Sequence, residues 1–211
     1  MKRLLVVGAG GHGKVVADTA EQISCWDLIE FVDLEFPKLT KCGPWDVVAK
    51  DLEELTDEYN GADFVVAIGD NKTRMKVFSD SLILDFNPVS LILPTAYVSK
   101  HSAVCLGSVI FANASINVNA TIGRGAIINT GATVDHDCLL AEGIHISPGA
   151  NLAGEVSVGC LSWIGIGASI KQQIKIGENV TVGSGAAVVN DIPDFETVIG
   201  VPAKPIEAVH F

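Results

Sequence analysis

The sequence predicts an α/β N-terminal domain, about half of a Rossmann-like doubly wound sheet, followed by an all-β parallel β-helix. The main observation is a period of six, because every sixth residue from Ile92 to Val188 is Ile, Val or Leu. The chain also begins with the order strand, glycine turn, helix, in "RLLVVGAGGHGKVVADTAEQI". Its 21 glycines and 6% aromatic residues indicate many tight turns. We therefore expect two domains, residues 1–88 and residues 89–211, the second with a C-terminal tail.

The period of six indicates a coil with three sides. A mostly small residue stands four positions beyond each aliphatic one, as at Ala114, Ala120 and Ala126. Neither the helical period of 3.6 nor simple strand alternation produces this spacing. Three hexads make a coil of about 18 residues, and coils stacked about 4.8 Å apart align the aliphatic residues in an internal ladder. Ordinary short strands are the alternative, but they do not require an unbroken period. The ladder positions are Ile92, Val98, Val104, Ile110, Ile116, Ile122, Ile128, Val134, Leu140, Ile146, Leu152, Val158, Ile164, Ile170, Ile176, Val182 and Val188.

The region before the repeats predicts alternating strands and helices. "LIEFVD" predicts a second strand that ends at Asp33, and "ADFVVAIGD" predicts a third. Residues 34–50 are expected to form a loop, residues 51–58 a short helix and residues 71–81 a longer helix. About four parallel strands are therefore expected in this domain, roughly half the number in a complete doubly wound sheet.

The glycine turn predicts a nucleotide site. The glycines of "GAGGHG" have the spacing G-x-G-x-x-G, and Asp33 lies where a dinucleotide site has its ribose-binding acid. These glycines let a ligand approach the backbone, and the following helix N-terminus favours phosphate. The domain is too short for a complete dinucleotide fold, so we expect one nucleotide, with NAD as the alternative. His12 either contacts that ligand or only caps the helix or bonds the backbone. Gly69 ends a neighbouring strand at the same edge, where ligands bind in such sheets.

Charge and composition exclude several classes of protein. The net charge of −11 and the absence of a basic stripe argue against a nucleic-acid-binding protein. No stretch approaches 18 apolar residues and no signal peptide is visible, so we expect no membrane association. The five cysteines are scattered and never spaced C-x-x-C, which is typical of reduced thiols in a cytoplasmic protein and not of disulfides or a zinc site.

One cluster of polar residues interrupts the repeats. Asp135, His136, Asp137 and Cys138 stand together in a stretch that is otherwise small and uncharged. His136 is off the ladder, and Gly154, one coil later, leaves open space beside its ring. A surface histidine is one interpretation; a general base is the other, because imidazole titrates near neutral pH and an adjacent carboxylate stabilises imidazolium. Cys138 falls on a small inward position, so we expect it in the core.

Both halves together resemble the hexapeptide-repeat nucleotide-sugar acetyltransferases. The motifs that carry this resemblance are "GAGGHGKVV", "AIGDNKTR", "NTGATVDHDC", "IHISPGA" and "IGVPAKPI", in one order over essentially the whole chain. The family includes bacillosamine and perosamine N-acetyltransferases and the sialic acid O-acetyltransferase-like proteins. The resemblance implies a left-handed β-helix, a homotrimer with active sites between subunits, acetyl-CoA bound to the β-helix, a nucleotide sugar bound to the N-terminal domain, and no metal.

The resemblance also implies roles for individual residues. His136 would be the catalytic base, assisted by Asp137. The residues expected to contact acetyl-CoA are His145, Gly154, Ile166, Gly183 and Ser184. Those expected to contact the nucleotide sugar are Gly10, Gly11, His12, Asp33, Leu34 and Gly69. Leu34 departs from relatives that use uridine nucleotides, which often have a second Asp there, so the base of the nucleotide stays open.

The expected activity is acetyl-CoA-dependent N-acetylation of the 4-amino group of a nucleotide-linked 4-amino-4,6-dideoxy sugar, with a UDP-sugar favoured, for the synthesis of surface glycans. The nearest alternative is O-acetylation of sialic acid or a related sugar. Two further alternatives are an NAD-dependent oxidoreductase that uses the glycine turn and a trimeric scaffold without activity.

Overall fold

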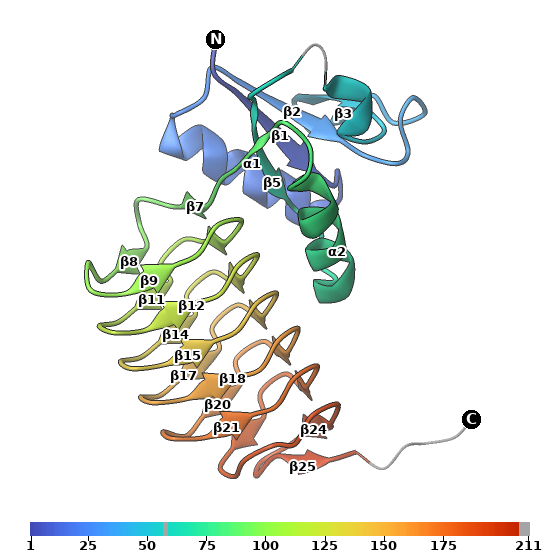
Figure 1. Ribbon diagram of the computed structural model, residues 1–211. Coiled ribbons are helices and arrows are strands. Elements are labelled where there is room, and N and C mark those ends of the chain that lie inside the picture. The colour runs from blue at the N-terminus through green and yellow to red at the C-terminus, as the bar shows by residue number, and fades with distance from the viewer. Residues whose placement is uncertain (57–58, 207–211) are drawn as a thin grey trace. The chain divides into compact units, whose positions relative to one another are not determined.

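The computed structural model describes residues 1–56 and 59–206 (Figure 1). The chain divides into two compact units: Met1–Pro94 with Leu106–Val109, and Thr95–Cys105 with the chain from Ile110 onward. In the described ranges neither of the two α-helices is long and apolar enough to cross a membrane.

The first unit is built on a six-stranded sheet of order β3-β4-β2-β1-β5-β6. Strand β1 lies in the middle and pairs in parallel with β2 on one side and β5 on the other. The strands are β1 Arg3–Val7, β2 Leu28–Val32, β3 Lys41–Cys42, β4 Trp45–Ala49, β5 Asp63–Val66 and β6 Asn87–Pro88; the helices are α1 Gly11–Ile23 and α2 Asn71–Ser81, with a further short strand β7 Leu91–Ile92. The order of connection reverses at β1, and the switch-point rule places ligands at that position of such a sheet.

Residues 34–50, expected as a loop, contain two strands, so that prediction is wrong. Gly43, in the left-handed region at φ 65°, closes a hairpin between β3 and β4, and β4 runs parallel to β2. Pro and Gly in this segment were the signal for a loop, but they mark the hairpin turn itself. The parallel series is β4-β2-β1-β5-β6, which is longer than expected. Strand β6 was not predicted because it is too short to produce a sequence pattern.

The short helix expected over residues 51–58 is reduced to one 3₁₀ turn, Glu53–Leu55. Residues 57 and 58 lie outside the described part of the chain. The helix expected over residues 71–81 is confirmed as α2, whose first turn is capped by the Asp70 carboxylate accepting the Thr73 N–H at 2.8 Å.

The core of the first unit lies on both faces of the sheet. Leu4, Leu5 and Val6 are all fully buried, which explains why β1 reads as an unbroken apolar run. On one face Phe78 of α2 packs against Phe64, with ring centroids 6.1 Å apart. A Cβ at position 13 would collide with the Gly8 carbonyl, so this glycine allows α1 to approach the strand closely.

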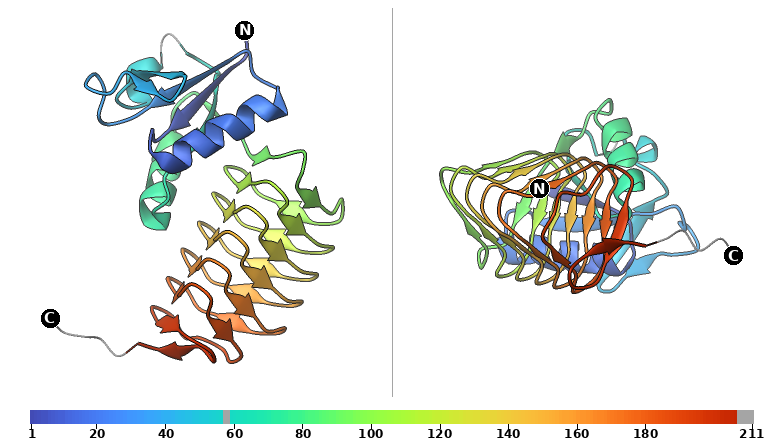
Figure 2. Two further views of the ribbon diagram at one scale, coloured as in Figure 1. Left: turned by 180° about the vertical axis from the view of Figure 1, so that it is seen from behind. Right: turned by 90° about the horizontal axis from the view of Figure 1, so that it is seen from below.

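The second unit is a parallel β-helix of short strands on three faces (Figure 2). Partner residues lie 18 positions apart on all three faces, for example Ile116 with Val134 and Ile122 with Leu140, except in the last coil, where Thr181 pairs with Thr197. The 18-residue coil is therefore confirmed; its left-handed winding stays a prediction. The strands are β8 Tyr97–Val98, β9 Ala103–Val104, β10 Val109–Ile110, β11 Ser115–Ile116, β12 Thr121–Ile122, β13 Ile127–Ile128, β14 Thr133–Val134, β15 Leu139–Leu140, β16 His145–Ile146, β17 Asn151–Leu152, β18 Ser157–Val158, β19 Trp163–Ile164, β20 Ser169–Ile170, β21 Lys175–Ile176, β22 Thr181–Val182, β23 Ala187–Val188, β24 Thr197–Ile199 and β25 Lys204–Pro205.

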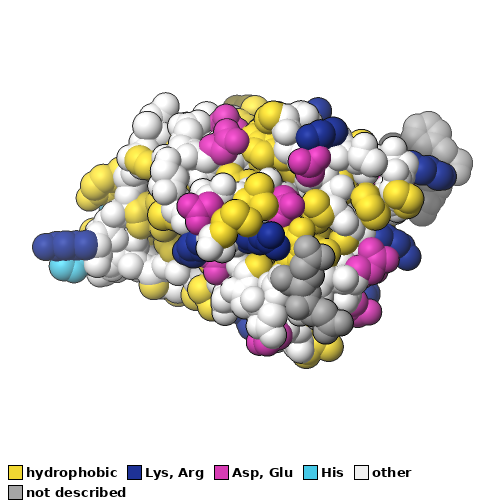
Figure 3. All heavy atoms as spheres, turned by 90° about the horizontal axis from the view of Figure 1, so that it is seen from above, with side chains coloured by type: hydrophobic (Ala, Val, Ile, Leu, Met, Phe, Trp, Pro, Cys, Tyr) yellow, Lys and Arg dark blue, Asp and Glu magenta, His cyan; other side chains and the backbone are white. Residues whose placement is uncertain are grey.

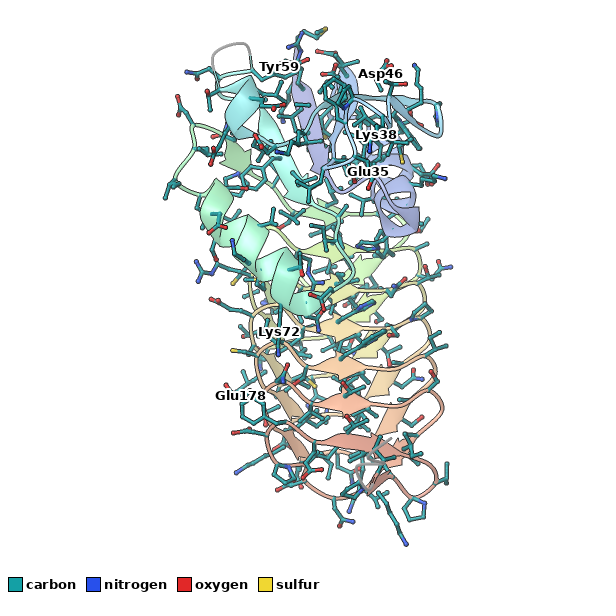
Figure 4. The ribbon with its side chains drawn as sticks, turned by 90° about the vertical axis from the view of Figure 1, so that its right-hand side faces the viewer. Glu35, Lys38, Asp46, Tyr59, Lys72 and Glu178 are labelled. Carbon is teal, nitrogen blue, oxygen red and sulfur yellow. The ribbon has the colours of Figure 1, made fainter. Side chains whose placement is uncertain are left out.

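The ladder residues form one continuous core from Ile110 to Val188, together with the small residues of the second register. Cys138 is fully buried among them, as expected. Charged side chains such as Glu178 project outside the stack of coils (Figure 4). The ladder fails at its first position, since Ile92 is 38% exposed and its neighbour Leu91 is buried instead. Val98 and Val104 are only partly buried because β8 and β9 are end strands of their sheets.

The corners of the coil have a period of six as well. From position 107 to position 185 every sixth residue has a positive φ, a conformation that glycine, Asn and Asp adopt most readily. One of these corner residues is Asp137, at φ 58°. The corner residues are Gly107, Asn113, Asn119, Gly125, Gly131, Asp137, Gly143, Gly149, Glu155, Leu161, Gly167, Gln173, Asn179 and Gly185.

Candidate active site

His136 and Asp137 form a hydrogen-bonded pair at a corner of the β-helix, between β14 and β15. The distance from His136 Nδ1 to Asp137 Oδ2 is 2.7 Å. With an ionised carboxylate, Nδ1 carries the proton and Nε2 is left as the basic nitrogen. The His136 side chain is 48% exposed, so a substrate in solution can reach its ring.

The backbone around His136 is fixed by the second acid of the cluster. Asp135 Oδ1 accepts the His136 N–H at 2.8 Å. The His136 carbonyl in turn accepts the Glu155 N–H of the next coil at 2.9 Å. Both bonds hold the main chain in place while the imidazole extends outward.

The surrounding charges favour a protonated imidazole. The hydrogen bond that His136 donates to Asp137 is the largest influence and raises the pKa of His136 above its ordinary value; burial opposes the shift, and the charges of Asp135 and Glu155 add to it. The same hydrogen bond, with a second from Asn119, lowers the pKa of Asp137. The pair therefore resembles the base and its orienting acid in acyl-transfer enzymes.

Gly154 lies directly against the His136 ring. A Cβ built at position 154 would lie 2.5 Å from both Cε1 and Nε2 of His136. The space left by this glycine is therefore occupied by the imidazole, whereas the sequence analysis expected it to stay open beside the ring. Gly154 is therefore the residue of the next coil against which the His136 ring packs.

His145 lies on a different face of the coil, in β16. Its ring stacks on Trp163 of β19, with centroids 5.6 Å apart and an interplanar angle of 5°. Asn129 Nδ2 lies 3.2 Å from His145 Nε2, and the Trp163 indole N–H donates to Ser147 Oγ at 2.6 Å. Within one chain His145 is therefore not brought to the His136 corner.

Ile166 and Ser184 occupy equivalent corner positions in adjacent coils. The Gly185 N–H donates to the Ile166 carbonyl at 2.8 Å. Ile166 is 59% exposed. Gly183 is close to Ile199, whose Cγ2 would be 2.6 Å from a Cβ at that position. These residues form a second group, which follows the face that carries His145.

The first unit has a pocket of about 360 Å³ at the carboxyl ends of β1, β2 and β5. Asp33 and Leu34 line it, as does Gly8. Asp33 Oδ2 accepts the Ala9 N–H at 2.7 Å and Oδ1 accepts the Glu35 N–H at 3.0 Å, so this carboxylate also shapes the glycine turn. Glu35 and Lys38, both labelled in Figure 4, belong to the segment that follows Asp33.

The remaining residues predicted for the nucleotide sugar do not line this pocket. Gly10 and Gly11 are exposed at the start of α1, and a Cβ at either would meet nothing within 4 Å. A larger hollow of about 710 Å³ lies at the other end of β1, around Lys2 and Asp63, and contains none of the predicted site residues.

His12 is largely buried beside Arg74. Burial, and second the Arg74 charge, lower the pKa of His12 to about 4, so its ring is neutral at physiological pH. Arg74 is 1% exposed and donates to the carbonyls of Ile68 and Gly69 at 3.0 and 3.1 Å. This arginine therefore fixes the turn after β5 that contains the predicted Gly69.

Known proteins with this arrangement are acetyltransferases. Residues 3–81 match the PglD N-terminal domain family. The acetyltransferase domain of PglB from Neisseria gonorrhoeae FA1090, solved with acetyl coenzyme A, has a TM-score of 0.93 and 41% sequence identity, covering 97% of this chain and 99% of that one. A variant of perosamine N-acetyltransferase from Caulobacter crescentus, solved with CoA and GDP-perosamine, has a TM-score of 0.92 and 36% identity over 98% of both chains.

This chain belongs to the hexapeptide-repeat nucleotide-sugar acetyltransferases. The resemblance found in the sequence is thus confirmed. UDP-N-acetylbacillosamine N-acetyltransferase of Bacillus subtilis (strain 168) is 38% identical over 116 residues, 53% of this chain and 52% of that protein. The chain therefore matches about half the length of this curated relative.

The structure of this acetyltransferase-family chain also shows residues that the sequence analysis missed. Trp163 stacks on His145, and Asn119 bonds Asp137. Each of these residues lies 18 positions from its partner, a spacing that the sequence already contained. Within residues 1–56 and 59–206 no group of three or more His, Cys, Asp or Glu is placed to hold a metal ion.

Proposed function

We propose that this protein transfers the acetyl group of acetyl-CoA to the 4-amino group of a nucleotide-linked 4-amino-4,6-dideoxy sugar. The His136–Asp137 pair is the observation that carries the proposal, since it supplies an oriented, solvent-accessible base. The relatives from B. subtilis and C. crescentus, both named as amino-sugar N-acetyltransferases, support the substrate class.

In the proposed reaction Nε2 of His136 takes the proton from the sugar amine as its nitrogen attacks the thioester carbonyl. The proton on Nδ1 stays there and is donated in a hydrogen bond to Asp137, whose charge stabilises the imidazolium that forms. The C–S bond then breaks, the amide forms, and the imidazolium returns the proton to the leaving thiolate. The base must remove this proton during the attack, because the amine becomes positively charged as its bond to the carbonyl carbon forms.

We assign residues 89–211 to acetyl-CoA and residues 1–88 to the nucleotide sugar. His145, Ile166, Gly183 and Ser184 are the proposed coenzyme contacts. For Gly154 we extend the same assignment, because its position beside the imidazole places it where the acetyl group must arrive. Gly10, Gly11, His12, Asp33, Leu34 and Gly69 are the proposed contacts of the nucleotide sugar.

A UDP-sugar is the favoured substrate in this proposal. The B. subtilis relative is named for a UDP-sugar and the C. crescentus relative is solved with a GDP-sugar. The pocket beside Asp33 has room for one nucleoside at the switch point of the sheet. Leu34, 76% exposed at its rim, offers an apolar surface to a base.

We further propose a homotrimer in the cytoplasm. In one chain His145 and His136 lie on different parts of the coil perimeter, so a coenzyme that touches both must lie between two subunits. Sedimentation velocity of the full chain tests the assembly, and a monomer at micromolar concentration would contradict it.

On the face seen in Figure 3, basic side chains are separated by acidic and uncharged ones, an arrangement that offers nucleic acid no continuous basic stripe.

The activity is tested by incubating the protein with acetyl-CoA and a panel of UDP-, dTDP- and GDP-linked 4-amino sugars, and by following thiol release. We expect release with a UDP-linked sugar and a product whose acetyl group resists hydroxylamine, as an amide does. Release with free sialic acid and a labile ester product would instead support the O-acetyltransferase alternative. Thermal stabilisation by NAD but not by coenzyme A would point to an oxidoreductase.

Replacement of Asp137 by Asn should change the pH dependence of this reaction. The base acts only when His136 is neutral, and Asp137 raises the pKa of that ring, so the native acid limb lies at higher pH than the ordinary titration of histidine. Without the carboxylate the pKa falls and the acid limb moves to lower pH, while the plateau of kcat/KM falls by about tenfold or more because the ring loses its orientation. A profile of kcat/KM against pH measures both effects. An acid limb at the native pH in Asp137→Asn would show that Asp137 does not raise the pKa of His136. Asp191→Asn, which changes an acid of the same unit away from His136, is the control.

A further inference from the structure

One corner of the β-helix carries a column of four polar residues. Asn119, Asp137, Glu155 and Gln173 follow one another at intervals of one coil, and all four have a positive φ between 58° and 63°. The amide of Asn119 donates to Asp137, and the amide of Gln173 donates to Glu155. The corner thus contains two acid–amide pairs. In the second pair the amide lies one coil after its acid, with Gln173 Nε2 3.3 Å from both carboxylate oxygens of Glu155, and only the first pair bonds the imidazole of His136.

The two oxygens of Asp137 have different partners. Oδ1 accepts the Asn119 amide N–H at 3.0 Å, and Oδ2 pairs with His136 Nδ1 at 2.7 Å. A carboxylate held at one oxygen only can rotate about its χ2 axis and present the other in many directions. Holding Oδ1 from the neighbouring coil therefore restricts where Oδ2 can lie, and with it the plane of the imidazole.

The charge of the donor is as important as its position. The groups that face His136 are the carboxylates of Asp135, Asp137 and Glu155. A lysine or arginine in the place of Asn119 would hold Asp137 too, but its charge would offset the carboxylate and disfavour imidazolium. A neutral amide fixes the carboxylate and leaves its charge available to the histidine.

The preceding coil makes a parallel contact to the other acid. Asn117 Nδ2 donates to Asp135 Oδ1 at 2.8 Å, the same oxygen that accepts the His136 backbone N–H. The main chain and the side chain of His136 are thus each held by an acid, and each acid is held by an asparagine one coil earlier.

We propose that Asn119 is a positioning residue for His136 and acts through the Oδ1 atom of Asp137. Its importance for catalysis rests on the proposed acetyl transfer, whereas its effect on the imidazole does not. The Asn119 amide donates to Asp137 and not to the His136 ring. It extends the base and its acid into a chain of three residues that spans two coils.

The variant that tests the proposal is Asn119→Gly. Glycine keeps the left-handed backbone at this corner without strain and removes only the amide. Gln173→Gly is the matched control, because it removes the same kind of donor at the same corner without touching Asp137. Asn119→Asp, which the left-handed corner also tolerates, adds a like charge beside Asp137.

The first measurement needs no ligand. NMR titration of the histidine rings in the full chain, with His136 assigned by its loss in His136→Gln, gives the pKa of that ring. Asn119→Gly should lower this pKa toward the ordinary value for histidine, because Asp137 pairs less often with the ring. Gln173→Gly should shift it far less, because Glu155 acts on the ring through its charge and not through a hydrogen bond to it. A folded Asn119→Gly protein with the native His136 pKa would overturn the proposal.

The second measurement is kinetic. With acetyl-CoA and the accepted amino sugar, Asn119→Gly should lower kcat by roughly threefold to tenfold and leave the KM for acetyl-CoA unchanged, with Asn119→Asp lower still. A loss confined to KM, or an equal loss in Gln173→Gly, would contradict a positioning role. If the native protein transfers no acetyl group, the proposed function fails, while the NMR titration still decides whether Asn119 positions the ring.

Discussion

Replacement of His136 by Ala is expected to lower the kcat of acetyl transfer by about 10²- to 10⁴-fold, the usual contribution of a general base. Without the imidazole no positioned group takes the proton from the attacking amine, and Asp137 is too weak a base to replace it because its pKa is lowered. The KM for acetyl-CoA should change little, since the ring acts in the transition state and not in coenzyme binding.

Several measurements separate this loss from a loss of structure. The His136 side chain is half exposed, so its truncation should leave the thermal midpoint of unfolding within a few degrees of the native value. His101→Ala is the control, an exposed histidine of the same unit with no part in the site. Native kcat in His136→Ala would show that another residue is the base, whereas a native protein without acetyl transfer would favour the scaffold alternative.

The β-helix was predictable because each coil repeats the same physical requirement. A ladder residue must be aliphatic, the residue four positions on is mostly small, and a corner favours glycine or Asn. Seen over many coils, these weak preferences become one strong period. The prediction failed at Ile92, where the coils begin and the neighbouring Leu91 is buried in the first unit instead.

The first unit was harder to predict because nothing in it repeats. The hairpin of β3 and β4 contains the glycine and proline that usually mark a loop, and its strands are short. The helix expected over residues 51–58 had acidic residues suited to a first turn, but its described part winds only once, at Glu53–Leu55. Local propensity is a weak guide where the tertiary contacts of a few residues decide the outcome.

The site was partly predictable for the same reason as the coil. His136 and Asp137 are neighbours in sequence, so their pairing could be expected from the motif. Asn119 and Gly154 meet them across one coil, and only the period of 18 residues reveals that contact. In a β-helix, the residues 18 positions before and after a candidate base are therefore the first to consider as its supports.

Gly154→Ala should impair the reaction almost as severely as loss of the base. The backbone at this position is not in the left-handed region, so alanine fits the main chain. Its methyl carbon, however, would lie 2.5 Å from Cε1 and Nε2 of His136, and an ordinary contact requires about 3.5 to 4 Å. The ring must therefore move by about 1 Å or rotate away from Asp137, and a displacement of that size costs about 10²-fold in rate.

A double-mutant comparison tests whether this loss passes through the histidine. In a His136→Ala background the added methyl group meets no ring, so Gly154→Ala should lower the residual rate far less than it lowers the native rate. The NMR signal of His136 should shift in Gly154→Ala alone, which shows the displacement without any substrate. Equal losses in the two backgrounds would show that Gly154→Ala acts only through the proposed contact of Gly154 with the coenzyme and not through the imidazole.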